Sequence, residues 1–285
     1  MSTNTFVPTI WSKEIALGVK RALVAAQPGV VNHDYEGDVA NQGDSVHING
    51  LEPVTVKDYD RTAGLGAPER LTTNRTTLTI DQAKSFDFLV DDIEKVQTNP
   101  KYLASATDDS AYRIALVEDD FVLGVMVAGA GNATGANKIT VTGAQGIDAA
   151  EDFYDKILIP LRTRLNKAEC PTAARFVLVD ADAEAKLLLD KRFVASGADA
   201  ADDRLQNGVI GKAAGFTVIL TNAPAIAGKA VAGVGNATTV ADQIVKVRGM
   251  ESENWFGTRV SGLRVYGAKV TRPANLAVAT WANKS

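Results

Sequence analysis

The chain has 285 residues, of which 46% are hydrophobic and 22% are charged. A disordered chain would be less apolar and a protein with many membrane spans would be less charged, so this composition predicts a globular protein. A chain of this length has room for about two domains and buries about 75% of its unfolded surface. Its 30 Lys and Arg against 34 Asp and Glu give a net charge of -4, which argues against a dedicated nucleic-acid-binding protein with a basic surface.

Cysteine and histidine are scarce. Cys170 is the single cysteine, and His33 and His47 are the two histidines. One cysteine excludes an intramolecular disulfide and a paired-cysteine metal site, and two histidines leave little material for zinc or iron ligation. The most apolar window, 121–130, is far shorter than the roughly 20 residues of a membrane-spanning helix. We therefore expect no metal, no cofactor and no membrane segment, and the polar N-terminus predicts no secretion signal.

The N-terminal region is predicted to hold a short amphipathic helix over residues 12–26. Ile15, Val19 and Leu23 fall on one helical stripe, and a Pro-Gly pair ends the run. The following residues, up to Gly43, have no sustained hydrophobic period and are rich in Asp, Asn and Gly. Such a segment is typical of an extended arm that precedes any domain.

Alternating apolar residues predict two strands within residues 44–84. The apolar residues are Val46, Ile48, Val54, Val56, Leu78 and Ile80. The polar, glycine-containing segment between the strands is too long for a tight turn, so we predict a long hairpin with a flexible tip. Two strands alone are at best marginally stable in water. Because these strands are rich in Thr and Arg and offer little apolar surface, we expect a neighbouring subunit to support the hairpin.

A strand and a very long helix are predicted next. Residues 86–90 alternate as a strand does, and residues 91–97 are typical of a capped turn or short helix. Asn99 and Pro100 form a good helix start. The apolar residues at helical spacing after them are Ile114, Val117, Phe121, Val125 and Ala128. A helix from 100 to 128 would be about 43 Å long at 1.5 Å per residue, which is the length of an architectural strut.

Another α/β region is predicted beyond a boundary near residue 148, after a short strand at 138–142. Its first helix has one apolar face, formed by Phe153, Ile157, Leu161 and Leu165, and Pro160 is expected to kink it. Residues 175–180 predict a buried strand that leads into a helix capped by Asp180 or Asp182. Residues 217–222 predict another buried strand.

The C-terminal residues are predicted to be β. A stretch of small residues, 223–239, carries no clear pattern. The last forty residues then alternate through Val260, Leu263, Val265 and Val270, and close with an apolar strand at 277–281.

Charge is unevenly distributed along the chain. Residues 85–120 hold nine acidic and three basic side chains (net -6), whereas residues 246–285 hold seven basic and two acidic (net +5). Two hypotheses account for these complementary segments: ordinary surface variation, or head-to-tail contact between copies, which needs two different patches on one subunit. The acidic clusters are Asp108-Asp109, Glu118-Asp119-Asp120 and Asp202-Asp203. Adjacent carboxylates on a helix point in different directions, so we expect a solvated face rather than a cation site.

No catalytic motif is recognisable. The GxSxG motif is absent, and a Ser-His-Asp triad would have to use His33 or His47, which lie in the predicted arm and hairpin where nothing buries them. The glycine-rich segments 129–135 and 207–215 match neither a dinucleotide fingerprint nor a phosphate loop. Cys170 has no base nearby in sequence and is expected to be an inert buried thiol. We therefore predict no catalytic residues and no enzymatic activity.

Three stretches stand in a specific order along the chain. They are SFDFLVDDIEKVQ (85–97), NGVIGKAAGFTVILTN (207–222) and RGMESENWFGTRVSGLRVYGAKVTRP (248–273). In this order and spacing they resemble the major capsid protein of tailed bacteriophages, and the resemblance covers nearly the whole chain. It implies an α+β chain with the Hong Kong-97-type capsid fold, which combines an N-terminal arm, an extended β-hairpin loop, a peripheral domain with a long spine helix, and an axial domain.

The resemblance also implies a division of the chain. The expected segments are an N-terminal arm (1–43), an extended loop (44–84), a peripheral domain with the spine helix (85–147), an axial domain (148–245) and a return to the peripheral domain (246–285). The arm, the hairpin and the strut also follow from the residue patterns alone, and they are features that a shell subunit needs.

The function implied by the resemblance is mechanical. Copies of the chain are expected to form pentamers and hexamers through the axial domain, and these build the icosahedral head shell that encloses phage double-stranded DNA. The arm and loop are expected to lie across neighbours. The residues expected to make contacts between subunits at the loop tip are Arg61, Gly64, Leu65, Gly66, Glu69 and Arg70. Exposed ion pairs are worth only about 0–1 kcal/mol each, so stability must come from many repeated contacts.

The partners that the resemblance implies are further copies of the chain, a portal protein, and packaged DNA held non-specifically on the inner face. A separate scaffolding protein, or none, is expected because the arm begins close to Met1. A decoration protein is compatible with this arrangement. The implied location is the virion, with assembly in the host cytoplasm.

Two alternatives remain open on sequence. An encapsulin-type bacterial nanocompartment shares the fold and houses an enzyme cargo, and an amphipathic helix at 12–26 would suit cargo docking. A carboxylate-dependent hydrolase using Asp or Glu pairs belongs to a different class, and the shortage of His, Cys and motifs argues against it.

Overall fold

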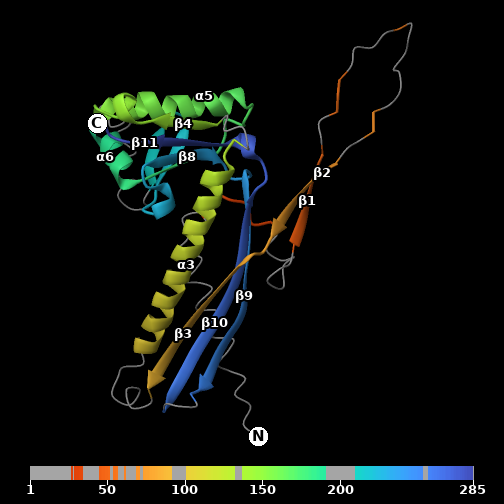
Figure 1. The fold of residues 1–285 in the computed structure, drawn as a ribbon, viewed down its shortest axis with the longest axis vertical. Coiled ribbons are helices and arrows are strands. Elements are labelled where there is room, and N and C mark those ends of the chain that lie inside the picture. Colours follow the sequence, from red (N-terminus) through yellow and green to blue (C-terminus); the bar gives the residue numbers. More distant parts are fainter. Residues whose placement is uncertain are drawn as a thin grey trace.

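The computed structural model describes residues 27, 29–34, 45–51, 54–56, 61, 69–70, 73–91, 101–131, 137–190, 209–252 and 256–284. Within them the strands form three sheets, with the orders β1-β2, β3-β10-β9 and β4-β11-β8-β5-β7-β6. Helix α3 and the three-stranded long sheet run side by side along the length of the molecule, the six-stranded sheet lies at one end with helix α5 over it, and the β1-β2 hairpin stands apart (Figure 1). The predicted α+β class is confirmed.

The elements have the following bounds. They are β1 (Ser45–Leu51), β2 (Thr73–Thr79), β3 (Gln82–Asp91), α3 (Lys101–Gly129), β4 (Lys138–Val141), η2 (Gly143–Gln145), α4 (Ala150–Phe153), η3 (Tyr154–Leu158), α5 (Ile159–Lys167), β5 (Arg175–Val179), α6 (Ala181–Leu189), β6 (Val209–Ala213), β7 (Phe216–Leu220), η5 (Pro224–Ile226), β8 (Lys229–Val234), β9 (Thr238–Glu251), β10 (Gly257–Val270), η6 (Pro273–Asn275) and β11 (Leu276–Trp281). The predicted helix at 12–26 and turn at 91–97 lie outside the described residues, apart from Asp91 at the end of β3.

Helix α3 has 29 residues and confirms the predicted strut. Its buried face differs from the predicted stripe, because Val117 and Ala128 are exposed. The buried residues among its described side chains are Ile114, Ala115, Glu118, Asp119, Val122, Leu123 and Met126. The reason is that α3 packs against two sheets: its C-terminal half joins the core under the six-stranded sheet, and a second face contacts β10. The buried arc is therefore wider than one stripe, and it includes two carboxylates.

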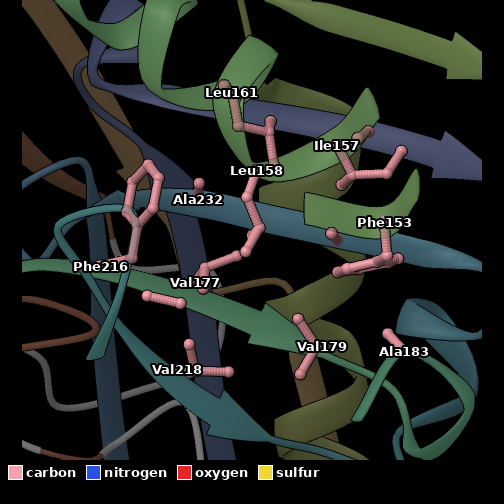
Figure 2. Close-up of a cluster of buried hydrophobic side chains, with 14 of the residues drawn as sticks. Phe153, Ile157, Leu158, Leu161, Val177, Val179, Ala183, Phe216, Val218 and Ala232 are labelled. Carbon is pink, nitrogen blue, oxygen red and sulfur yellow. The ribbon is translucent and has the colours of Figure 1, made fainter. Parts of the chain in front are cut away.

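The six-stranded sheet is buried on both faces. On β5, Val177 and Val179 pack under the helices, whereas Phe176 and Leu178 point toward α3. Figure 2 shows the helix side of this core, with Phe153, Ile157, Leu158 and Leu161 set against Val177, Val179, Val218 and Ala232. A central strand that is covered on both sides accounts for the continuous apolar run at 175–179.

The predicted helix face after residue 150 is confirmed, since all four of its residues are fully buried. Pro160 sits just after a π-helical turn, η3, in which the backbone N–H of Ile159 donates to the carbonyl of Tyr154. A proline lacks an N–H and crowds the preceding turn, and the wider π turn accommodates its ring without ending the helix. The predicted cap on α6 is also confirmed, because Asp180 Oδ1 accepts from the backbone N–H of Ala183 at 3.0 Å.

Two strands of the six-stranded sheet come from outside the range predicted for the axial domain. Strand β4 pairs in parallel with β11, and β11 pairs antiparallel with β8. The segments predicted as 85–147 and 246–285 therefore each contribute a strand to the sheet that was expected within 148–245. These pairings join residues that are far apart in the chain, so no local sequence pattern predicts them.

The base of the hairpin is supported by its own subunit, contrary to the expectation. Leu78 and Ile80 are fully buried against Ala241 and Val265 of the long sheet. Gly267 of β10 makes this approach possible, because a Cβ there would overlap the carbonyl oxygen of Thr79. The hairpin therefore needs a neighbour only beyond its base.

We expect Gly267→Ala to lower the free energy of unfolding by about 1–3 kcal/mol, because the added methyl group forces the hairpin base away from β10. The matched control is Gly124→Ala in α3, where an added Cβ meets nothing within 4 Å. That change should raise the free energy of unfolding by about 0.5–1 kcal/mol through helix propensity. Urea denaturation of the unassembled subunit measures both, and equal effects would contradict the packing argument.

Candidate assembly surfaces

The hairpin extension is defined here by the described residues that lie between β1 and β2 in the chain, namely Val54–Val56, Arg61, Glu69 and Arg70. Val54 and Val56 were predicted to continue the first strand, but β1 ends at Leu51 and Val54–Val56 belong to no strand. Their side chains are 59% and 95% exposed. The antiparallel register of β1 and β2 runs only from Ser45 opposite Thr79 to Leu51 opposite Thr73. Two apolar side chains of the extension are therefore exposed to solvent.

Three of the six predicted loop-tip residues are described. Arg61, Glu69 and Arg70 are all exposed. The Glu69 carboxylate accepts from the backbone N–H of Thr55 at 3.1 Å and from its hydroxyl at 3.3 Å, so Glu69 ties the two sides of the extension together. Gly64, Leu65 and Gly66 lie outside the described residues.

The acidic and basic segments meet within one subunit. Asp87 of β3 faces Arg259 of β10, and Arg259 Nε donates to both carboxylate oxygens of Asp87 at 2.9 and 2.8 Å. This hydrogen-bonded pair holds the pKa of Asp87 below its ordinary value. Both side chains are about half exposed. At least this pair of opposite charges from the acidic and basic segments is therefore formed within one subunit rather than between copies.

A buried ionic cluster joins α3 to the long sheet. Arg264 of β10 lies with Nε 2.8 Å from Glu118 Oε2, and its Nη2 also contacts the carboxylate of Asp242 on β9. The Arg264 and Glu118 side chains are almost completely buried, and Asp242 is partly so. Tyr266 is buried beside them, and the pKa of its phenol is raised to about 12, chiefly by burial. The expectation of a solvated acidic face was wrong for Glu118 and Asp119.

Glu118 titrates near neutrality. Burial, which penalises the charged form, raises the pKa of Glu118 to about 7; Arg264 acts in the opposite direction, and the Asp242 charge raises the pKa further. His33 in the N-terminal arm adds a smaller lowering effect. Glu118 and Asp242 share one arginine in a site that excludes water. Glu118 therefore keeps its proton well above pH 4.5.

We expect stability to fall as the pH rises from about 4.5 to about 7. In this window the folded state holds a proton on Glu118 that the unfolded chain has already lost, so rising pH favours unfolding. A pKa raised from 4.5 to about 7 corresponds to about 3 kcal/mol across the window. Glu118→Gln should abolish this part of the slope in urea denaturation at a series of pH values. An unchanged slope in the variant would assign the dependence to other groups.

No sequence pattern predicts the inward-facing Arg264. The predicted alternation placed Leu263 inward, but Leu263 is 38% exposed and Arg264 is buried. Even-numbered residues of β10 face α3 here, and Val265 on the opposite face is buried by the hairpin base. With both faces of β10 covered, a period of two no longer marks a single apolar face.

No three His, Cys, Asp or Glu side chains of the described residues gather as a metal site requires. Of the described helices, none is long and apolar enough to cross a bilayer. His47 is exposed on the hairpin, with Nδ1 3.3 Å from Thr77 Oγ1. Cys170 is buried, and burial raises the pKa of its thiol, as expected for an inert cysteine.

Comparison with known structures identifies the fold. The structure described as Mycobacterium phage Che8 is 30% identical, with a TM-score of 0.67 over 87% of this chain and 88% of that chain. The capsid of cyanophage P-SCSP1u is 14% identical, with a TM-score of 0.66 over 89% of this chain and 86% of that chain. The virus-like particle from Pyrococcus furiosus is 12% identical, with a TM-score of 0.58 over 96% of this chain and 99% of that chain. The last two likenesses concern the fold alone.

Sequence comparison identifies the family. A search of curated proteins gave no match. The family described as phage capsid protein matches residues 73–279, which include the second hairpin strand, α3, the long sheet and the six-stranded sheet. This match spans well over half of the chain, and it agrees with the Hong Kong-97-type fold and with the 30% identity to the phage Che8 structure. The chain therefore belongs to the phage capsid protein family and is a structural protein of the bacteriophage head.

Proposed function

We propose that copies of the chain assemble as pentamers and hexamers that close into an icosahedral head shell around phage double-stranded DNA. The observation that carries the proposal is the hairpin extension, on which Val54 and Val56 stand largely exposed. Apolar side chains on a projecting element are an interaction surface. In a shell, the extension lies on a neighbouring subunit, which covers them.

The proposed division of labour follows the predicted segments. These are an arm (1–43), an extended loop (44–84), a peripheral domain (85–147 with 246–285) and an axial domain (148–245) that forms the capsomer centre. The residues proposed to contact neighbours at the loop tip are Arg61, Gly64, Leu65, Gly66, Glu69 and Arg70. The proposed partners are the portal protein, a separate scaffolding protein, a decoration protein and the packaged DNA, with assembly in the host cytoplasm.

The test is assembly itself. The full chain is expressed alone and with the phage's scaffolding protein, and is then analysed by size-exclusion chromatography and negative-stain electron microscopy. We expect closed shells or pentameric and hexameric rings. A chain that stays monomeric at high concentration with the scaffolding protein present would contradict the proposal.

A second candidate function is a nanocompartment shell that encloses a protein cargo. The fold is compatible with it, since a virus-like particle from Pyrococcus furiosus has the same fold. The contents of purified particles separate the two functions, since a phage head holds DNA after packaging and a nanocompartment co-purifies with a cargo protein.

A further inference from the structure

A short segment that precedes the hairpin in the chain, residues 29–34, is docked on the edge of the long sheet. The backbone N–H of Asn32 donates to the carbonyl of Thr238 at 2.9 Å, and the carbonyl of Asn32 accepts from the N–H of Val240 at 3.0 Å. This parallel bridge extends the sheet beyond its edge strand β9. Val30 and Val31 are buried in the core that α3 shares with the six-stranded sheet. We call residues 29–34 the docked segment.

The docked segment brings His33 to the buried ionic cluster. His33 stands two residues after Val31, and alternate residues of an extended segment lie on the same face. Val31 packs with residues of α3, so His33 is placed on the α3 side of the long sheet, where Glu118 lies. The charge of His33 accordingly lowers the pKa of Glu118, and the ring Nε2 of His33 is buried.

The groups that face Glu118 come from each element packed around it. They are Arg264 and Tyr266 on β10, Asp242 on β9 and His33 in the docked segment. Two further carboxylates lie nearby. Asp81, at the base of the hairpin, acts on Tyr266 but is exposed, and Asp119 lines a hollow beside residues 220–224.

The cluster has one more carboxylate than Arg264 can balance. Glu118 and Asp242 both contact the Arg264 guanidinium, and Tyr266 adds no charge because its pKa is raised to about 12. A charge that is left without a counter-charge in a site that excludes water is costly. One proton, held by Glu118 or by His33, removes the imbalance. The docked segment therefore closes a site that is neutral only while this proton is bound.

We propose that the docked segment is a proton-linked latch: residues 29–34 stay on the long sheet while Glu118 or His33 holds one proton, and they detach when that proton is lost. Detachment releases the N-terminal arm, of which the docked segment is a part, from its own subunit. The latch works within a single subunit, so it does not rest on the proposed function.

The direction of the pH dependence follows from Glu118. In the docked state its pKa is about 7, and detachment lets water reach the cluster and returns this pKa toward its ordinary value. Docking therefore takes up a proton, so it weakens as the pH rises toward 7 and levels off above that pH. A detached His33 also binds a proton below about pH 6.5, which offsets part of the effect. We expect the detached population to rise about three- to tenfold from pH 6 to pH 8.5.

Hydrogen exchange of the full-length, unassembled subunit, followed by NMR, measures this detachment. The amides of Asn32 and Val240 donate the two hydrogen bonds of the bridge. Their protection, expressed relative to the intrinsic exchange rate at each pH, should fall about three- to tenfold from pH 6 to pH 8.5. The reference amide is that of Thr221, which donates to the carbonyl of Val179 at 2.9 Å inside the six-stranded sheet. It should stay better protected than Asn32 at every pH, because the latch opens locally.

Two variants test the charge balance independently. Glu118→Gln and Asp242→Asn each leave one carboxylate for Arg264, so no proton is needed and each should remove the fall in protection at Asn32. The matched control is Asp87→Asn, which removes a carboxylate of the same sheet from a half-exposed pair with Arg259. This control should keep the fall.

Three results would overturn the latch. They are a flat profile at Asn32 in the wild-type chain, equal protection of Asn32 and Thr221 at every pH, and a fall that persists in either cluster variant. The first two need no variant, so the proposal stays testable if a variant does not fold. Each of them leaves the proposed shell function untouched, because the measurement is made on the unassembled subunit.

Discussion

Replacing Arg264 by leucine is expected to lower the free energy of unfolding by about 3–5 kcal/mol at pH 8, which is the loss seen when one partner of a buried ion pair is removed. Arg264 neutralises Glu118 and Asp242 in a site where both Arg264 and Glu118 are almost completely buried. Without the guanidinium, the two carboxylates lose their main counter-charge. Urea denaturation of the unassembled subunit measures the loss.

The matched control is Arg259→Leu on the same strand. Arg259 also pairs with a carboxylate, that of Asp87, but both side chains are about half exposed. Water replaces an exposed partner, so the expected loss is about 0–1 kcal/mol. The loss for Arg264→Leu should also be smaller at pH 6, because Glu118 is protonated there in either protein. Equal losses for the two arginines would show that burial does not set the cost.

Phe153→Ala is expected to lower the free energy of unfolding by a similar amount, about 3–5 kcal/mol, because it leaves a cavity in a packed core. Phe153 is fully buried between the α4–α5 helix and the six-stranded sheet (Figure 2). Its ring meets Trp281 of β11 edge to face, with centroids 5.4 Å apart. Removing it loosens the contact between the helix layer and the C-terminal strand.

Phe256→Ala is the control for Phe153→Ala. Phe256 is 88% exposed, and a surface substitution of this kind changes stability by about 0.5 kcal/mol at most. Thermal unfolding of the two variants should differ by roughly 6–20 °C, at about 2–4 °C per kcal/mol for a domain of this size. Similar unfolding temperatures would mean that the core does not depend on this contact.

Elements with a strong local period could be predicted from the sequence. The 29-residue α3, the apolar face from Phe153 to Leu165, and the buried strand at 175–179 all follow from patterns that one element carries alone. Strand β8 was missed because it is built largely from Ala, Gly and Val, which have no clear alternation. It lies inside the six-stranded sheet between β11 and β5, where small side chains fit between two covered faces.

The candidate assembly surfaces were predictable only in part. The hairpin was evident from alternation, because its pattern is local. The ionic cluster was not, because Glu118, Asp242 and Arg264 come from α3, β9 and β10 and meet only through tertiary packing. An exposed valine or tyrosine within an amphipathic helix looks in sequence like part of the core face.

The order of synthesis affects when the six-stranded sheet of a newly made subunit can close. Strand β4 has β11 as its ladder partner, and β11 is translated more than a hundred residues later. Pairing across so long a separation is slow, because loop-closure entropy is lost before the contacts form. Until β11 emerges from the ribosome, the six-stranded sheet lacks the strand that joins β4 to β8. We therefore expect this sheet to close only when synthesis of the chain is almost complete.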